Sequence, residues 1–177
     1  MSIFKNKLFV ILFAFLMLLV DGHLSLLSRI LFQNQFIVSS HFLFIVLLFY
    51  TLVFNPYFIF GLACVLGIIY DFYYLGVYNL GIATMLYPLT IVIMFKLWKH
   101  IPNGPVQRFL VFFILIFFLD FASIGMAYLY QLTAYPLNDF ITYNLAPSLI
   151  FNILAFLFFQ KLLERIYLWK AMLKHFK

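Results

Sequence analysis

Three aspartates, Asp21, Asp71 and Asp120, lie inside otherwise apolar stretches of the sequence and have the widest scope for chemistry. A charge near the centre of a bilayer costs roughly 2.5–3.5 kcal/mol on insertion scales, so an intramembrane carboxylate is a candidate functional group. These carboxylates could form a protonatable relay, contact a ligand, or bind a partner as a polar cluster. The structural alternative is that they cap helix ends or pair with one another and with nearby Tyr, Asn or Ser groups.

Small residues form a second set of candidates, because helices in lipid associate through close approach of their backbones. This set comprises Gly61, Ala63, Gly67, Gly76, Gly81, Ser123, Gly125 and Ala127. Ala63 precedes Gly67 by four residues, and Ser123 precedes Ala127 by the same spacing, so each pair shares one helix face. Packing inside the bundle and contact with a partner's span both remain open.

Enzyme signatures are missing from the chain: it has no H-E-x-x-H, no G-x-S-x-G and no glycine-rich phosphate loop. The histidines are scattered and form no metal motif: His23, His41, His100 and His175. Tyr70-Asp71 is similar to half of an intramembrane aspartyl protease site, but Asp120 lacks the flanking glycine that the second half requires. With one cysteine, Cys64, no intrachain disulfide can form. We expect no enzyme, metal or cofactor.

The composition indicates the elements that position these residues. Of the 177 residues, 67% are hydrophobic and 9% are charged, whereas soluble domains have roughly 45–50% and about 25%. These fractions exclude a soluble globule and a disordered chain. A spanning helix needs roughly 20 apolar residues, so the chain holds about six spans. We expect residues 1–177 to form a single all-α, multi-pass membrane domain.

Charges and turn residues divide the chain into six apolar runs. The predicted spans are about Leu8–Leu27 (interrupted by Asp21-Gly22-His23), His41–Phe54, Tyr57–Tyr74, a fourth from the Gly76–Asn79 turn to near Phe95, Phe109–Tyr130 and Phe140–Phe159. A polar stretch, Ser28–Ser40, follows the first span, and Asn55-Pro56 predicts a tight hairpin. A loop is predicted over Lys96–Arg108, and Pro136-Leu137-Asn138-Asp139 predicts another, in which Asp139 is exposed to water. The runs are apolar all round, unlike the alternating strands of a barrel.

The three aspartates fall in the first, third and fifth spans, where the chain runs outward each time. Asp21 and Asp71 lie toward the outer ends, and Asp120 lies nearer the middle of its span. A glycine follows each of them within five residues, which suggests a weak hairpin repeat.

Lysines and arginines orient the predicted bundle. Ten lie on the side that holds both termini: Lys5, Lys7, Lys96, Lys99, Arg108, Lys161, Arg165, Lys170, Lys174 and Lys177. The other side holds Arg29. This bias predicts that both termini are cytoplasmic. The net charge of +6 is therefore an orientation signal that also suits anionic lipids, and it does not indicate nucleic-acid binding.

The last 17 residues, 161–177, are predicted to form an amphipathic basic tail. Its apolar side chains recur at helical spacing: Leu162, Ile166, Trp169, Leu173 and Phe176. Such a helix lies at the cytoplasmic headgroups, or it docks a cytosolic partner, and the two interpretations are compatible.

The middle of the chain carries a distinctive run of glycines and one aspartate: Gly67-Ile68-Ile69-Tyr70-Asp71, Leu75-Gly76 and Leu80-Gly81. This run resembles the MreD family of rod shape-determining proteins, whose members carry a glycine-spaced third span that ends in G-x-x-x-D and an L-G…L-G turn. Asp21 before Gly22 is also similar to the first span of the family. Length, span number and predicted topology fit over the whole chain.

The resemblance implies a non-catalytic component of the bacterial plasma membrane that maintains cell shape in the elongation machinery for peptidoglycan. MreD proteins work with MreC, which has one span and an extracytoplasmic coiled-coil and β domain. The glycan polymerase RodA and a class B transpeptidase act alongside them, and in rods the MreB filament is a further partner. The helical bundle is also similar to the S components of ECF vitamin transporters.

That second similarity supplies an alternative from a different class, a substrate-binding subunit of a small-molecule transporter. S components typically carry an A-x-x-x-A patch in the first span for their transport partner. Here Ala14 is followed four residues later by Leu18, so the patch is missing. Co-purification separates the hypotheses, because a scaffold retains a single-span coiled-coil partner whereas an S component retains ATPase subunits and a vitamin.

Overall fold

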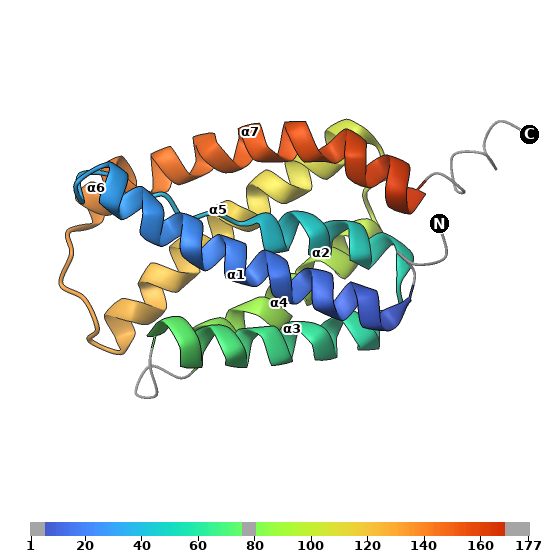
Figure 1. Cartoon of the computed structure of the whole chain (residues 1–177), viewed down its shortest axis with the longest axis horizontal. Coiled ribbons are helices and arrows are strands. Elements are labelled where there is room, and N and C mark those ends of the chain that lie inside the picture. Colours follow the sequence, from blue (N-terminus) through green and yellow to red (C-terminus); the bar gives the residue numbers. More distant parts are fainter. Residues whose placement is uncertain (1–5, 76–80, 169–177) are drawn as a thin grey trace, which may run out of the picture.

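The computed structural model describes residues 6–75 and 81–168, and within those ranges the chain forms helices and no β-strand (Figure 1). The α-helices are α1 (Lys7–Leu31), α2 (Phe42–Val53), α3 (Pro56–Tyr70), α4 (Ile82–Trp98), α5 (Pro105–Leu129), α6 (Leu137–Phe140) and α7 (Ala146–Leu163). Three π-helical turns extend α3, join α6 to α7 and extend α7: Asp71–Leu75, Ile141–Leu145 and Glu164–Leu168. The all-helical prediction is confirmed for these residues.

The six expected spans are unequal in length. Four helical rods are long and apolar enough to cross a membrane: Lys7–Leu31, Pro56–Tyr74, Pro105–Leu129 and Leu137–Tyr167. α4 has 17 residues and α2 only 12, so α2 reaches about 18 Å against a hydrocarbon core of about 30 Å. Six full-length helical spans are therefore not confirmed, and residues 36–41, which precede α2, are not helical.

The first predicted span is a single helix, although Asp21-Gly22-His23 interrupts its apolar run. α1 continues unbroken to Leu31, because in lipid a helix satisfies its own backbone groups whatever its side chains. His23 adds a local bond, with Nδ1 lying 2.7 Å from the carbonyl of Leu19. The polar stretch Ser28–Ser40 comprises the last turn of α1, a turn at 32–35 and an extended segment at 36–41.

Turn chemistry sets where several helices begin. Asn6 and Asn55 each cap a helix, accepting from the backbone N–H two residues later at 3.0 and 2.9 Å. Proline occupies the first position of α3 and of α5, where its missing N–H costs nothing. α5 therefore begins at Pro105, four residues before the predicted Phe109.

The chain traverses the bundle so that the described ends lie together. The start of α1, the Asn55-Pro56 hairpin, the 99–104 loop and Leu168 lie at one end, and the turns at 32–36 and 130–136 lie at the other (Figure 1). We name these the lysine end and the cavity end. The lysine bias predicts that the lysine end is cytoplasmic.

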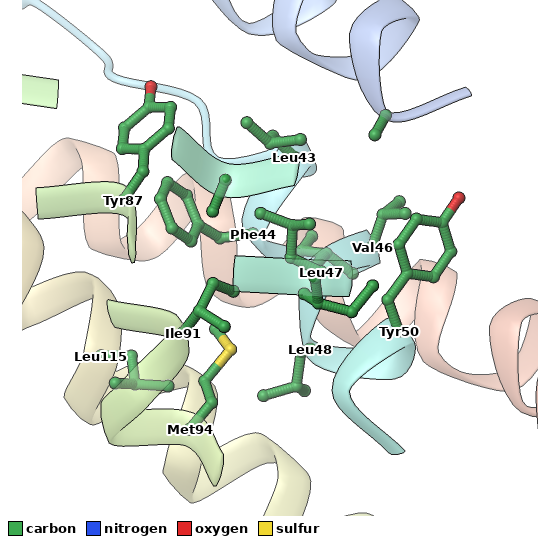
Figure 2. Close-up of a cluster of buried hydrophobic side chains, with 14 of the residues drawn as sticks. Leu43, Phe44, Val46, Leu47, Leu48, Tyr50, Tyr87, Ile91, Met94 and Leu115 are labelled. Atoms are coloured by element: carbon green, nitrogen blue, oxygen red, sulfur yellow. The ribbon is translucent and has the colours of Figure 1, made fainter. Parts of the chain in front are cut away.

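The core is centred on α2, the helix that is buried all round. Nine consecutive residues of α2, from Leu43 to Thr51, are buried, whereas the longer helices leave large apolar side chains exposed as a lipid-facing surface. Figure 2 shows Phe44 and Leu48 of α2 on the side toward Ile91 and Met94 of α4, whereas Val46 and Tyr50 point the other way. α2 also contacts α1 and α7, so it is the central helix of the bundle.

The predicted tail begins without a break in the helix. Leu163 and Tyr167 are buried against the bundle, and the hydroxyl of Tyr167 lies 3.4 Å from that of Tyr50 in α2. Leu162 is exposed and Ile166 packs against the core. The remaining residues of the predicted stripe lie outside the described residues: Trp169, Leu173 and Phe176.

α3 and α4 pack closely along one line of small residues. A Cβ at Gly67 would lie 2.6 Å from the carbonyl oxygen of Ala83, and Ala63 is completely buried. Gly61 lies on another face, where no described atom comes within 4 Å of the position that a methyl group would occupy. The helix therefore carries one glycine that sets an interhelical distance and one that does not.

Gly67→Leu should destabilise the protein by about 3 kcal/mol or more, because the side chain meets backbone that cannot move aside without separating α3 from α4. Thermal unfolding in detergent measures this, and Gly61→Leu on the same helix is the matched control, expected to change little. Equal melting temperatures for the two variants would contradict the close packing at Gly67.

Candidate functional site

Asp21 caps a neighbouring helix and not its own. Its carboxylate oxygens accept hydrogen bonds from the backbone N–H groups of Phe42 and Leu43 at 2.8 and 2.9 Å, and the side chain is buried. These groups are the unpaired donors at the start of α2, where the positive end of the helix dipole favours a carboxylate. Asp21 thus joins α1 to α2.

Asp71 does the same for α4 in the next hairpin. It accepts from the backbone N–H groups of Gly81, Ala83 and Thr84, each at 2.9 Å, and from the Thr84 hydroxyl at 2.7 Å. The side chain is completely buried. Gly81 adopts φ +124°, a conformation that glycine reaches without strain, and this turns its N–H toward Asp71. Gly76 lies outside the described residues.

Asp120 departs from that pattern. Its Oδ1 lies 2.9 Å from Nε2 of His41, the residue that precedes α2. Its Oδ2 is buried and has no hydrogen-bond partner among the described residues. Sequence reasoning counted His41 among scattered histidines, although its place at the start of an uncharged apolar run was a usable signal.

Residues 37–41 of the extended segment are held by four side chains of α1 and α7 and by one backbone carbonyl. Their five N–H groups donate, in order, to Tyr143 O (3.0 Å), Ser28 Oγ (3.1 Å), Ser148 Oγ (2.8 Å), Ser25 Oγ (3.3 Å) and Asn152 Oδ1 (2.8 Å). Asn152 also donates through Nδ2 to the Ser39 carbonyl at 2.7 Å. Non-helical backbone is tolerated at membrane depth only when its groups are satisfied in this way.

Sequence reasoning missed most of these acceptors, but their spacing carried a signal. Asp21, Ser25 and Ser28 lie at i, i+4 and i+7, and so form one polar stripe along α1. Ser148 and Asn152 are four residues apart on α7, and both are buried. A polar stripe inside an apolar span indicates polar backbone opposite it.

A cavity of about 660 Å³ lies at the cavity end, beside the extended segment. Charged and polar residues on its wall come from every element that meets there: Asp21, Ser25, Arg29, Asn34, Ser39, Ser40, His41, Tyr70, Tyr87, Asp120, Ser123, Thr133, Tyr135 and Asn144. Of the residues singled out from the sequence, Asp21, Asp120, Ser123 and Ala127 line this cavity. No group of three potential metal ligands occurs among the described residues.

A second polar cluster, at the lysine end, joins the start of α5 to the last part of the helical rod that contains α7. Arg108, placed by the sequence among loop cations, is instead 3% exposed in the first turn of α5, with its guanidinium 5.7 Å from the centre of the Phe49 ring. It forms an ion pair with Glu164 and donates to Asn103. Gln160 donates to the carbonyl of Pro105 at 3.1 Å. These contacts fix the start of α5 to the end of α7 and to the π-helical turn that follows it.

Two comparisons with known proteins point to the same family. The model of the family described as rod shape-determining protein MreD matches residues 3–169. A curated relative from Streptococcus pneumoniae, the cell shape-determining protein MreD, is 33% identical over 150 residues, which are 85% of this chain and 90% of the relative. No solved structure matches the chain.

Asp71→Asn should destabilise the protein by about 3 kcal/mol, because an amide nitrogen replaces one acceptor and faces backbone N–H donors in a buried site. Thermal unfolding in detergent is the measurement. Asp139→Asn is the control: Asp139 lies half-buried in the first turn of α6 and not in the predicted loop, so its loss should cost under about 1 kcal/mol. Equal costs would mean that the capping bonds carry no stability.

Proposed function

Because the chain belongs to the MreD family of rod shape-determining proteins, we propose that it is a non-catalytic membrane scaffold that binds MreC and positions or regulates the wall synthases. Family membership supports a role in cell shape. RodA and a class B transpeptidase are the proposed synthases, and MreB is a further proposed partner where the cell has that filament. The plasma membrane is the proposed location, with both termini cytoplasmic.

The use of Asp21 and Asp71 supports a scaffold over an enzyme that would employ either of them as a base. Both oxygens of Asp21 and both of Asp71 accept hydrogen bonds from main-chain N–H groups at helix starts. A general base needs an oxygen that is free to accept a proton from a substrate. These two residues serve to position helices, and Asp21 also lines the cavity.

The cavity carries the proposal, because it offers polar groups at the end of the bundle that is predicted to be extracytoplasmic. A single-span protein with an extracytoplasmic domain must leave the membrane at this level. The chain segment between its span and that domain is therefore the natural occupant of a partly polar cavity rimmed by lipid-facing helices. We place the MreC contact there.

Ser123→Trp should reduce recovery of MreC at least tenfold when the two proteins are co-expressed and co-purified in detergent. The indole fills the cavity from its α5 wall, and excluding a central contact of an interface typically costs more than about 1 kcal/mol. Ile114→Trp is the matched control, since Ile114 lies on the same helix, is 55% exposed and faces lipid.

Recovery that is unchanged by Ser123→Trp would remove the cavity as the docking site. Failure of the unaltered chain to retain MreC would remove the scaffold proposal itself. Co-purification of ATPase subunits with a bound vitamin would favour the transporter alternative, for which a cavity of this size is also suited.

A further inference from the structure

Two buried acceptors on the cavity wall lack partners. Asp120 Oδ2 and Asn144 Oδ1 have no hydrogen-bond partner within the part of the chain that the structure describes, and both residues line the cavity. A buried acceptor without a partner is uncommon, and for a carboxylate the cost of desolvation is large. Both oxygens lie just beneath the cavity surface, so a donor that enters the cavity satisfies them once a neighbouring side chain shifts to admit it.

The remaining charges around the cavity leave Asp120 as the open anionic group. Asp21 already uses its two oxygens at the start of α2. His41 serves Oδ1 of Asp120 from one side and leaves Oδ2 for the cavity. Arg29 lines the cavity but is exposed, so it stands at the rim and does not neutralise the interior.

Aromatic rings line the same cavity. Tyr87 packs edge-on against Phe44, with ring centres 4.9 Å apart, and Tyr70 lies 5.7 Å from Tyr87. All three residues belong to the cavity wall, and Figure 2 shows Phe44 and Tyr87 side by side. The faces of aromatic rings attract ammonium and guanidinium groups, most strongly where water is scarce.

We propose that the cavity binds a cationic group, the ammonium of a lysine or the guanidinium of an arginine, that the docked partner segment inserts against Asp120. Asp120 Oδ2 supplies the charge, Asn144 Oδ1 a second acceptor, and Tyr70 and Tyr87 the aromatic wall. Two acceptors and one negative charge are complementary to a group that is positive and rich in donors. The inference rests on the proposed function, because there the partner segment occupies this cavity.

The test is the affinity of MreC for the full chain in lipid nanodiscs. Asp120→Asn should weaken binding about tenfold or more, because it removes a charge-assisted hydrogen bond yet keeps the size of the side chain and a partner for His41. Asp139→Asn removes a half-buried carboxylate that is not part of the cavity lining and should leave the affinity unchanged.

Changes in the partner provide a test that leaves this chain unaltered. Each lysine and arginine of the partner segment next to its span is replaced in turn by glutamine. One replacement should weaken binding by the same factor as Asp120→Asn, and combining that replacement with Asp120→Asn should cost little more, since the two remove one interaction.

The outcomes separate this inference from the proposed function. Unaltered affinity for Asp120→Asn and for every partner variant, together with loss of binding for Ser123→Trp, would overturn the cation site while docking in the cavity survives; cavity water then satisfies Asp120. Unaltered binding by Ser123→Trp as well would overturn docking in the cavity. If Asp120→Asn proves unstable by thermal unfolding, the partner variants alone decide.

Discussion

The structure depends on satisfying the backbone of the non-helical segment that precedes α2. In hydrocarbon, each unpaired N–H or C=O costs several kcal/mol, so an extended stretch at 37–41 is tenable only with an acceptor for every N–H. α1 and α7 supply nearly all of those acceptors from side chains. The carboxylate of Asp21 accepts hydrogen bonds from the next two N–H groups, which are the first two of α2.

The other main features follow from that arrangement. The extended segment covers length that helix would otherwise have to span, so α2 can be short and can sit wholly inside the bundle. Holding the segment between α1 and α7 places His41 at the start of α2, where it faces Asp120 of α5. The cavity is the space left beside this segment. Stability and the proposed binding surface therefore share the same residues.

Much of the fold could be predicted from composition and from turn-forming residues. The apolar runs and the Asn55-Pro56 signal placed α3, α4, α5 and α7 to within a few residues of their observed starts or ends. The family could also be predicted, because the glycine-to-aspartate spacing that ends at Asp71 reflects one physical need, a carboxylate beside the next helix start.

What could not be predicted was pairing across distant segments. The sequence placed Arg108 in a loop, because a charge is taken as exposed unless its partner, Glu164, is known to lie beside it. His41 and Asp120 are 79 residues apart, and no local pattern joins them.

The small residues show why one motif can have opposite uses. On α3, Gly67 faces the α4 backbone, so its lack of a side chain sets a short interhelical distance. On α5, Ser123 and Ala127 line the cavity, and no described atom lies within 4 Å of a methyl group placed at Gly125. The inner half of α5 buries Val111, Phe112 and Leu115, whereas every residue from Asp120 to Tyr128 is only half-buried. Small side chains on α5 therefore keep space open where α5 parts from the bundle, and a binding surface needs that space more than it needs close packing.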